Sequence, residues 1–215
     1  MTPIELTVYL LALIGTGACS VSGAAAAIRK RLDLFGVFIV SAITGLGGGI
    51  LRDVLLSNLP PAMFRDPNFI LVITVVSVTV FLVAKFSPNY FRKDHHRLGD
   101  VLNVVDAVGL GAFTVLGINT ALNMGFRDNA FFLVFLGLTT GVGGGVLRDI
   151  TLREIPSIFT KHVYAIAALA GAILYVVMFL ALGLSEILSV FSSMALVIVL
   201  RILATCFRWN FPKAF

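Results

Sequence analysis

Two pairs of charged residues lie where a strongly apolar chain would not be expected to carry charge. Arg52-Asp53 follows a triple glycine at 47–49, and Arg148-Asp149 follows a second triple glycine at 143–145. Each pair begins about one helical turn after the last glycine, inside a long apolar segment. A charged group in lipid is costly and usually marks a functional site. We therefore interpret the two motifs as parts of one site within a membrane.

The glycines could supply the chemistry of this site. A kink at three glycines would free backbone carbonyls, which membranes tolerate only inside protein or beside a water-filled cavity. Such carbonyls suit a partly dehydrated cation, and we expect a transient monovalent cation near them. The adjacent Arg and Asp should leave the helix in different directions, so at least one needs another partner. The predicted pore-lining residues are Thr44, Gly47, Gly48, Gly49, Arg52, Asp53, Thr140, Gly143, Gly144, Gly145, Arg148 and Asp149.

Helix packing is the competing interpretation of the glycines. Gly45-x-x-x-Gly49 and Gly137-x-x-x-Gly141-x-x-x-Gly145 fit the small-xxx-small pattern that lets membrane helices approach closely. Packing alone does not explain why charges follow in both copies, so we favour permeation. Permeation predicts that leucine at Gly48 or Gly144 blocks conduction while the oligomer stays intact.

Composition narrows the function classes. The chain is 59% hydrophobic and 13% charged, with mean hydropathy +1.02, whereas soluble domains are about 25% charged. The net charge of +5 comes without a basic run containing aromatics, so no nucleic-acid partner is expected. No phosphate-binding glycine loop, metal-ligand cluster or nucleophile–base set is present, and we expect neither an enzyme nor a cofactor.

The elements that must position the motifs are membrane helices. The apolar stretches predict seven, over 6–28, 34–59, 69–84, 101–126, 130–155, 163–185 and 187–207. The polar stretch 85–100 is predicted to be a loop, and Arg201 to extend toward the membrane surface. We predict an all-α integral membrane protein with a single transmembrane domain over 1–215. It comprises a first three-helix repeat (1–91), a second (97–185), and a seventh helix with a tail (186–215).

The two halves are predicted to be inverted relative to each other. The motifs lie 96 positions apart, and a match without gaps would also pair Gly15 with Gly111. Three crossings per repeat is an odd number, so the second copy enters the membrane upside down, as in many transporters. With the N-terminus outside, only Arg52, Arg65 and Arg127 of the 16 basic residues fall outside. The C-terminus is therefore predicted to be cytoplasmic.

The doubled Gly-Gly-Gly-x-x-Arg-Asp motif resembles that of the trimeric intracellular cation (TRIC) channel family. The similar branch is prokaryotic, a bacterial membrane family also described as glycine transporters. Ser22-Gly23-Ala24, Asp106-Ala107-Val108-Gly109 and Phe113 add to the resemblance. It implies a homotrimer in the bacterial inner membrane with one pore per protomer, lined at the glycines by kinked second and fifth helices. Animal members bind inositol lipid through a lysine-bearing motif in a region where this chain has arginines.

Three functions remain open from the sequence. The first is a monovalent cation channel passing K⁺ and Na⁺, with membrane lipid and further copies of the chain as partners. The second is a carrier for a small zwitterion such as glycine, whose carboxylate and ammonium could be held by the Arg and Asp side chains. The third is a scaffold that transports nothing and assembles through its small-residue faces.

Overall fold

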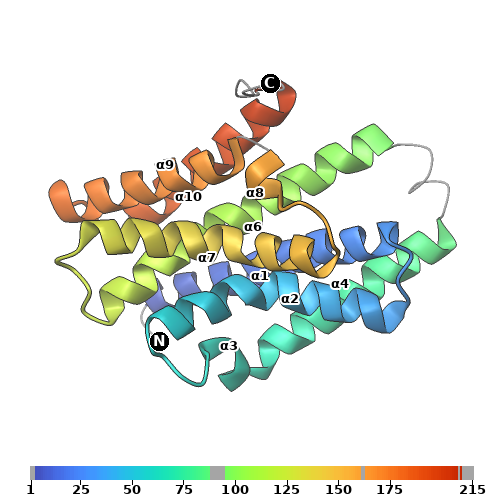
Figure 1. Ribbon diagram of the computed structural model, residues 1–215. Helices are drawn as coiled ribbons and strands as arrows, with labels where there is room; N and C mark the ends of the chain where they lie inside the picture. Colours follow the sequence, from blue (N-terminus) through green and yellow to red (C-terminus); the bar gives the residue numbers. More distant parts are fainter. Residues whose placement is uncertain (1–2, 88–94, 161–162, 208, 210–215) are drawn as a thin grey trace.

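The chain forms a bundle of long helices (Figure 1). The computed structural model describes residues 3–87, 95–160, 163–207 and 209. In these ranges seven helices are long and apolar enough to cross a membrane, which confirms the predicted all-α membrane fold. They are α1 (Pro3–Arg29), α2 (Leu34–Leu55), α4 (Pro67–Phe86), α6 (His95–Asn123), α7 (Ala130–Thr151), α9 (Val163–Val176) with its π-helical extension η1 (Val177–Ala181), and α10 (Glu186–Cys206). The short helices α3 (Ala62–Arg65) and α8 (Ser157–Thr160) follow α2 and α7.

Four long helices begin at a side chain that caps their first turn. The first amides of a helix have no intrahelical acceptor. Asp33 accepts a hydrogen bond from such an amide in α2, Asp66 in α4, Asn129 in α7 and Ser185 in α10. These residue types are the preferred N-caps, each contributing about 1 kcal/mol. The polar residues between the apolar stretches therefore fix where the helices start.

Some predicted boundaries were wrong. The helices α2 and α7 end four residues before the predicted limits of 59 and 155, because Ser57 (φ 56°) and Arg153 (φ 55°) turn the chain in a left-handed conformation. The helix α6 begins at His95, so the latter part of the predicted loop 85–100 is helical. Polar composition marks the membrane boundary there but does not end a helix, which can continue beyond the hydrocarbon.

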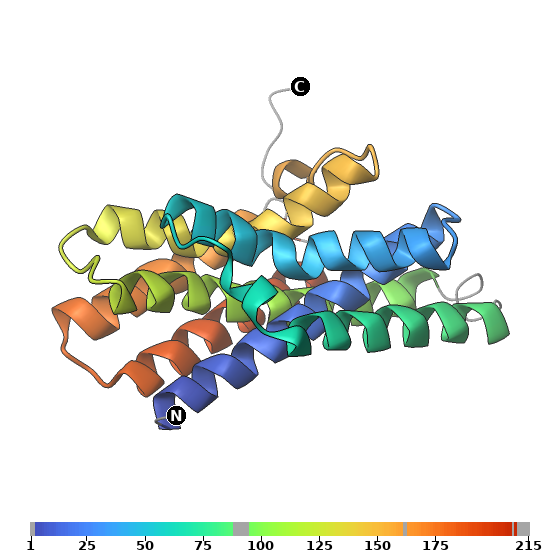
Figure 2. The ribbon, with the colours of Figure 1, turned by 90° about the horizontal axis from the view of Figure 1, so that it is seen from below.

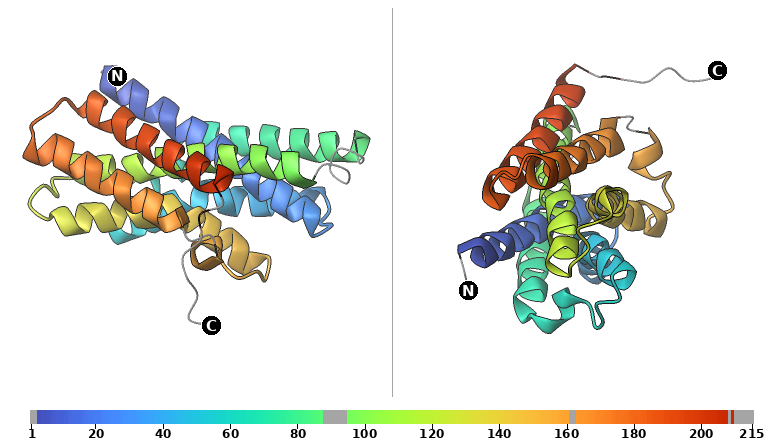
Figure 3. Two further views of the ribbon diagram at one scale, coloured as in Figure 1. Left: turned by 90° about the horizontal axis from the view of Figure 1, so that it is seen from above. Right: turned by 90° about the vertical axis from the view of Figure 1, so that its left-hand side faces the viewer.

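The helices α1, α2, α6 and α7 form the centre of the bundle. The helices α1 and α6 pack against each other and run in opposite directions, and α2 and α7 lie side by side next to them (Figures 1 and 2). The helix α4 packs on α1 and α2, whereas α9 packs on α6 and α7. The helix α10 covers α6 and α9 on the side away from α4 (Figure 3).

The two halves repeat the same contacts, with a shift that the sequence did not reveal. A Cβ on Gly23 would lie 2.5 Å from Thr44 Oγ1, and a Cβ on Gly117 would lie 2.7 Å from Thr140 Oγ1. The threonines are 96 positions apart but these glycines are 94 apart. The expected pairing of Gly15 with Gly111 is therefore wrong, and Gly109 is the counterpart of Gly15. The connection from α6 to α7 is two residues longer than that from α1 to α2.

Candidate functional site

The triple glycines are the place where α2 and α7 touch. A Cβ on Gly48 would overlap the carbonyl oxygen of Thr140, and a Cβ on Gly144 would overlap that of Thr44. Both helices run as continuous α-helix through these positions. The glycines therefore let two backbones approach, which is the packing role that the sequence left as the alternative. A bend of either helix axis, and with it a pore-lining role for the glycines, stays a prediction.

The predicted threonines are buried and occupied by their own helices. Thr44 Oγ1 donates to the carbonyl of Val40 at 2.6 Å, and Thr140 Oγ1 donates to the carbonyl of Leu136 at 2.6 Å. Each side chain faces a glycine of a neighbouring helix. Thr44 faces Gly23 of α1, and Thr140 faces Gly117 of α6. Both side chains are buried, and a pore-lining role for them stays a prediction.

Each arginine pairs with the aspartate next to it. Arg52 Nε donates to Asp53 Oδ1 at 2.8 Å, and Arg148 Nε donates to Asp149 Oδ1 at 2.8 Å. The long arginine side chain turns back over the helix and reaches the adjacent carboxylate. The expected further partner is also present, since Arg148 Nη1 donates to Ser22 Oγ at 2.7 Å. The second carboxylate oxygen of each aspartate accepts the backbone amide of the following segment at 2.7 Å, from Ala62 or from Ser157.

Two cavities lie toward different ends of the bundle, and each is lined by the arginine of one glycine motif. The Arg52 cavity, of about 670 Å³, is lined by the first part of α1, the last part of α6 and Arg52. The Arg148 cavity, of about 380 Å³, is lined by the last part of α1, the first part of α6, Arg148 and Asp149. Corresponding positions line both, 94 residues apart, among them Glu5 and Gly99, Tyr9 and Asn103, and Ala12 and Asp106. The other predicted pore residues do not line these two cavities.

The two cavities differ in chemistry. The Arg52 cavity carries the carboxylates of Glu5, Asp66 and Glu186 beside one arginine. At its deeper wall, Asn119 donates hydrogen bonds to Glu186 and to the Tyr175 hydroxyl. The Arg148 cavity has basic and acidic groups in closer balance, with Arg29, Arg148, Asp106, Asp149 and Glu154 in its lining. Within the described ranges no three His, Cys, Asp or Glu side chains are grouped to hold a metal ion.

Side chains of α1 and α6 contact Arg148, and side chains of α9 and α10 extend this cluster through Asp106. Arg148 Nη1 donates to Ser22 Oγ at 2.7 Å and lies 3.5 Å from Asp106 Oδ1. Asp106 Oδ2 lies 3.9 Å from Arg201 Nη2, and the Arg201 guanidinium stacks over the Tyr164 ring at 4.6 Å. The positions 94 residues away from Ser22 and Asp106 hold Leu116 and Ala12, which cannot make such contacts near Arg52.

Sequence reasoning did not place Ser22, Asp106 or Arg201 in the site. The first two entered only as matches to a family pattern. Arg201 was expected to reach the membrane surface, and that expectation was wrong, since its side chain is 4% exposed. The available signal was a single charge, Asp106, within an apolar stretch that already contained Gly109 and Gly111. Such a charge within the membrane requires a partner of opposite charge, and Arg201 was a candidate for that partner.

At the rim of the Arg52 cavity, Asp66 has a pKa below its ordinary value of 3.8. The first cause is the hydrogen bond from the Asn68 amide, and the second is the one from the Tyr9 hydroxyl, at 2.7 Å. Because the folded-state pKa is depressed, the stabilisation is present above pH 3.8 and is lost as the pH falls through the folded-state value. We expect the difference in melting temperature between wild type and Asp66→Asn to be constant from pH 7 to 5 and to shrink below pH 4. A difference independent of pH throughout would contradict this.

Comparison with known proteins gives matches that cover most of the chain. A family model described as "Glycine transporter" matches the chain twice, over residues 9–85 and 103–179. The solved structure of the TRIC trimeric intracellular cation channel orthologue from Rhodobacter sphaeroides is 30% identical, with a TM-score of 0.83, and the match covers 94% of this chain and 99% of that one. The chain belongs to the prokaryotic TRIC family.

Other TRIC relatives cover nearly the whole chain. A prokaryotic TRIC channel crystallised in 0.5 M KCl is 32% identical, with a TM-score of 0.84, over 96% of this chain and 100% of that one. The UPF0126 inner membrane protein YadS of Escherichia coli is 33% identical over 205 residues, which are 95% of this chain and 94% of the relative. The start positions of the two family-model matches differ by 94, the spacing that also relates the two cavities.

Proposed function

We propose that the chain is a monovalent cation channel that passes K⁺ and Na⁺. One pore per protomer would join the Arg52 cavity and the Arg148 cavity through the α2–α7 crossing. The observation that carries this proposal is the pair of corresponding cavities, which enter from different ends and each reach an arginine of the glycine motif. The tight glycine contact makes the described conformation a closed one. Opening requires α2 and α7 to move apart or to bend at the glycines.

The aspartates offset the positive charge of the two arginines, which would otherwise oppose cation passage. An unpaired arginine on the path would repel cations, but Arg52 and Arg148 each hold a carboxylate oxygen at 2.8 Å. The pairs are therefore close to neutral. The carboxylates of the Arg52 cavity would raise the local cation concentration at that mouth.

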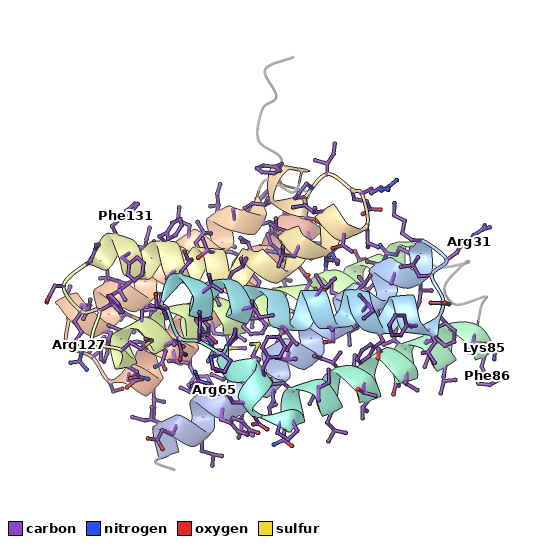
Figure 4. All side chains as sticks on the ribbon, turned by 60° about the horizontal axis from the view of Figure 1, so that its bottom comes forward. Arg31, Arg65, Lys85, Phe86, Arg127 and Phe131 are labelled. Atoms are coloured by element: carbon purple, nitrogen blue, oxygen red, sulfur yellow. The ribbon has the colours of Figure 1, made fainter. Side chains whose placement is uncertain are left out.

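We propose that the channel is a homotrimer in the bacterial inner membrane, with its halves forming an inverted repeat. The trimeric and inner-membrane assignments follow the names of relatives. Arg31 and Lys85 lie at one end of the bundle and Arg127 at the other (Figure 4). The excess of basic residues at the first end supports a cytoplasmic location for it, with the N-terminus outside.

A glycine carrier is the second candidate. It is favoured by the description of the family model and by Arg–Asp pairs near both cavities, which could bind a carboxylate and an ammonium group. A carrier would expose one cavity at a time and would saturate with substrate. A channel would pass ions at a rate proportional to the driving force.

Purified protein reconstituted into planar bilayers and liposomes separates these functions. We expect discrete ohmic current steps in symmetric KCl, with K⁺ and Na⁺ both permeant and chloride excluded. Counterflow of labelled glycine that saturates, without current steps, would instead establish the carrier. The absence of both from correctly assembled protein would leave the scaffold as the function.

A further inference from the structure

Asp106 of α6 is shared by two arginines from different helices. Its Oδ1 accepts a hydrogen bond from Ser22 at 3.0 Å and faces Arg148 Nη1 at 3.5 Å, while its Oδ2 faces Arg201 Nη2 at 3.9 Å. Close charge-assisted hydrogen bonds of this kind are about 2.8 Å long. The carboxylate is therefore not committed to either arginine in this conformation.

Arg201 has unused capacity to bind that carboxylate. Its side chain is buried, and its Nε finds no hydrogen-bond acceptor among the described residues. A buried donor without an acceptor is unfavourable, and the arginine fork fits a carboxylate through two parallel hydrogen bonds. Rotation of Asp106 toward α10 would bring its Oδ2 closer to Arg201 Nη2 than the present 3.9 Å. The same rotation would take the carboxylate away from Arg148.

We propose that Arg201 competes with Arg148 for Asp106 and thereby sets how firmly Arg148 is held in its cavity. This proposal rests on the channel function above. With Asp106 turned to Arg148, the guanidinium is fixed between α1, α6 and α7 and obstructs the path. With Asp106 turned to Arg201, Arg148 keeps only its neighbour Asp149 and Ser22, and it can move aside. Arg201 is a positioning residue that favours the conducting state.

The competition between Arg201 and Arg148 for Asp106 occurs at only one end of the proposed channel. The position that corresponds to Asp106 in the first half is Ala12, and α10 lies outside the repeat. Among the described residues that line the Arg52 cavity, Arg52 is the only arginine. The helix α10 supplies Arg201 beside Asp106, and the first half has no carboxylate at the corresponding position to make such a contact.

Single-channel recording of Arg201→Gln tests the proposal. Removing the competitor leaves Asp106 to Arg148, so we expect open probability to fall about fivefold or more with unitary conductance unchanged. Arg201→Lys keeps the charge but loses the fork, and we expect an intermediate open probability. Arg127→Gln, which removes the same charge at the opposite end, should leave open probability at the wild-type value. In an Asp106→Asn background, Arg201→Gln should have no further effect.

Three results would overturn the competition. They are an unchanged open probability in Arg201→Gln, a change confined to unitary conductance, and an equal effect with and without Asp106. If Arg201→Gln does not assemble, a wild-type open probability in Arg201→Lys overturns it equally. If wild type passes no current, the channel function itself fails, and melting temperatures of the two single variants and the double variant then decide. Additive effects in that cycle exclude coupling between Arg201 and Asp106.

Discussion

Alanine at Gly48 or at Gly144 is expected to destabilise the protein and to reduce the yield of assembled oligomer. The added methyl group would overlap a backbone carbonyl of the opposite helix, Thr140 or Thr44, and a carbonyl inside a helix cannot rotate away. Overpacking of this kind costs about 3 kcal/mol, which outweighs the gain of about 1 kcal/mol from replacing a helical glycine. Melting temperature and size-exclusion profile in detergent measure the effect.

Gly17→Ala is the matched control for this prediction. A Cβ at Gly17 of α1 would lie 3.5 Å from Val72 Cγ1, an ordinary van der Waals contact. The same substitution should therefore be neutral or slightly stabilising there. The sequence alone predicted that leucine at Gly48 blocks conduction in an intact oligomer, whereas the close packing makes loss of the fold the first consequence. If Gly48→Ala had the melting temperature of the wild type, the packing role would be contradicted and only the pore-lining role of the glycines would remain.

Neutralising Asp53 should have a similarly large effect. Asp53→Asn removes the charge that balances the buried Arg52 at 2.8 Å, and it disturbs the acceptor for the Ala62 amide. Removing one partner of a buried ion pair costs about 3–5 kcal/mol, because the remaining charge stays in a medium of low dielectric constant. We expect a clearly lower melting temperature and a weaker connection between α2 and α3, measurable as faster amide exchange at Ala62.

An exposed ion pair of the same molecule provides the comparison. Lys30 and Glu154 are 2.7 Å apart, but their side chains are 40% and 48% exposed. Glu154→Gln should therefore cost less than about 1 kcal/mol. Equal melting temperatures for Asp53→Asn and Glu154→Gln would show that burial of Asp53 does not determine the strength of its pair.

The fold could be predicted from the sequence because lipid leaves few alternatives. Apolar stretches near the length of the hydrocarbon core must be helices, and the doubled motif divided them into related halves. Helix ends were less predictable, since they depend on left-handed residues such as Ser57 and Arg153 and not on composition. The two-residue shift between α1 and α6 was not predicted, because the halves were aligned only by the spacing of the glycine motifs.

The candidate site was predicted in part. Three of the four Arg–Asp residues, Arg52, Arg148 and Asp149, line the two cavities, but the hydrogen bonds within each pair depend on how a long side chain folds back over its helix. The glycines fit two patterns equally well, and only the opposite carbonyls distinguish packing from a broken helix. Asp106 and Arg201 come from segments 95 positions apart, and no local spacing connects them.

The two cavities correspond in position but are lined by different side chains, so the two ends of the molecule differ in charge. On the proposed path, an ion entering from the Arg52 end would meet three carboxylates, whereas one entering from the other end would meet a nearly balanced set of charges. Corresponding positions line the two cavities, but several of these positions hold different side chains. For the proposed channel, this difference predicts a higher local cation concentration at the Arg52 end than at the Arg148 end.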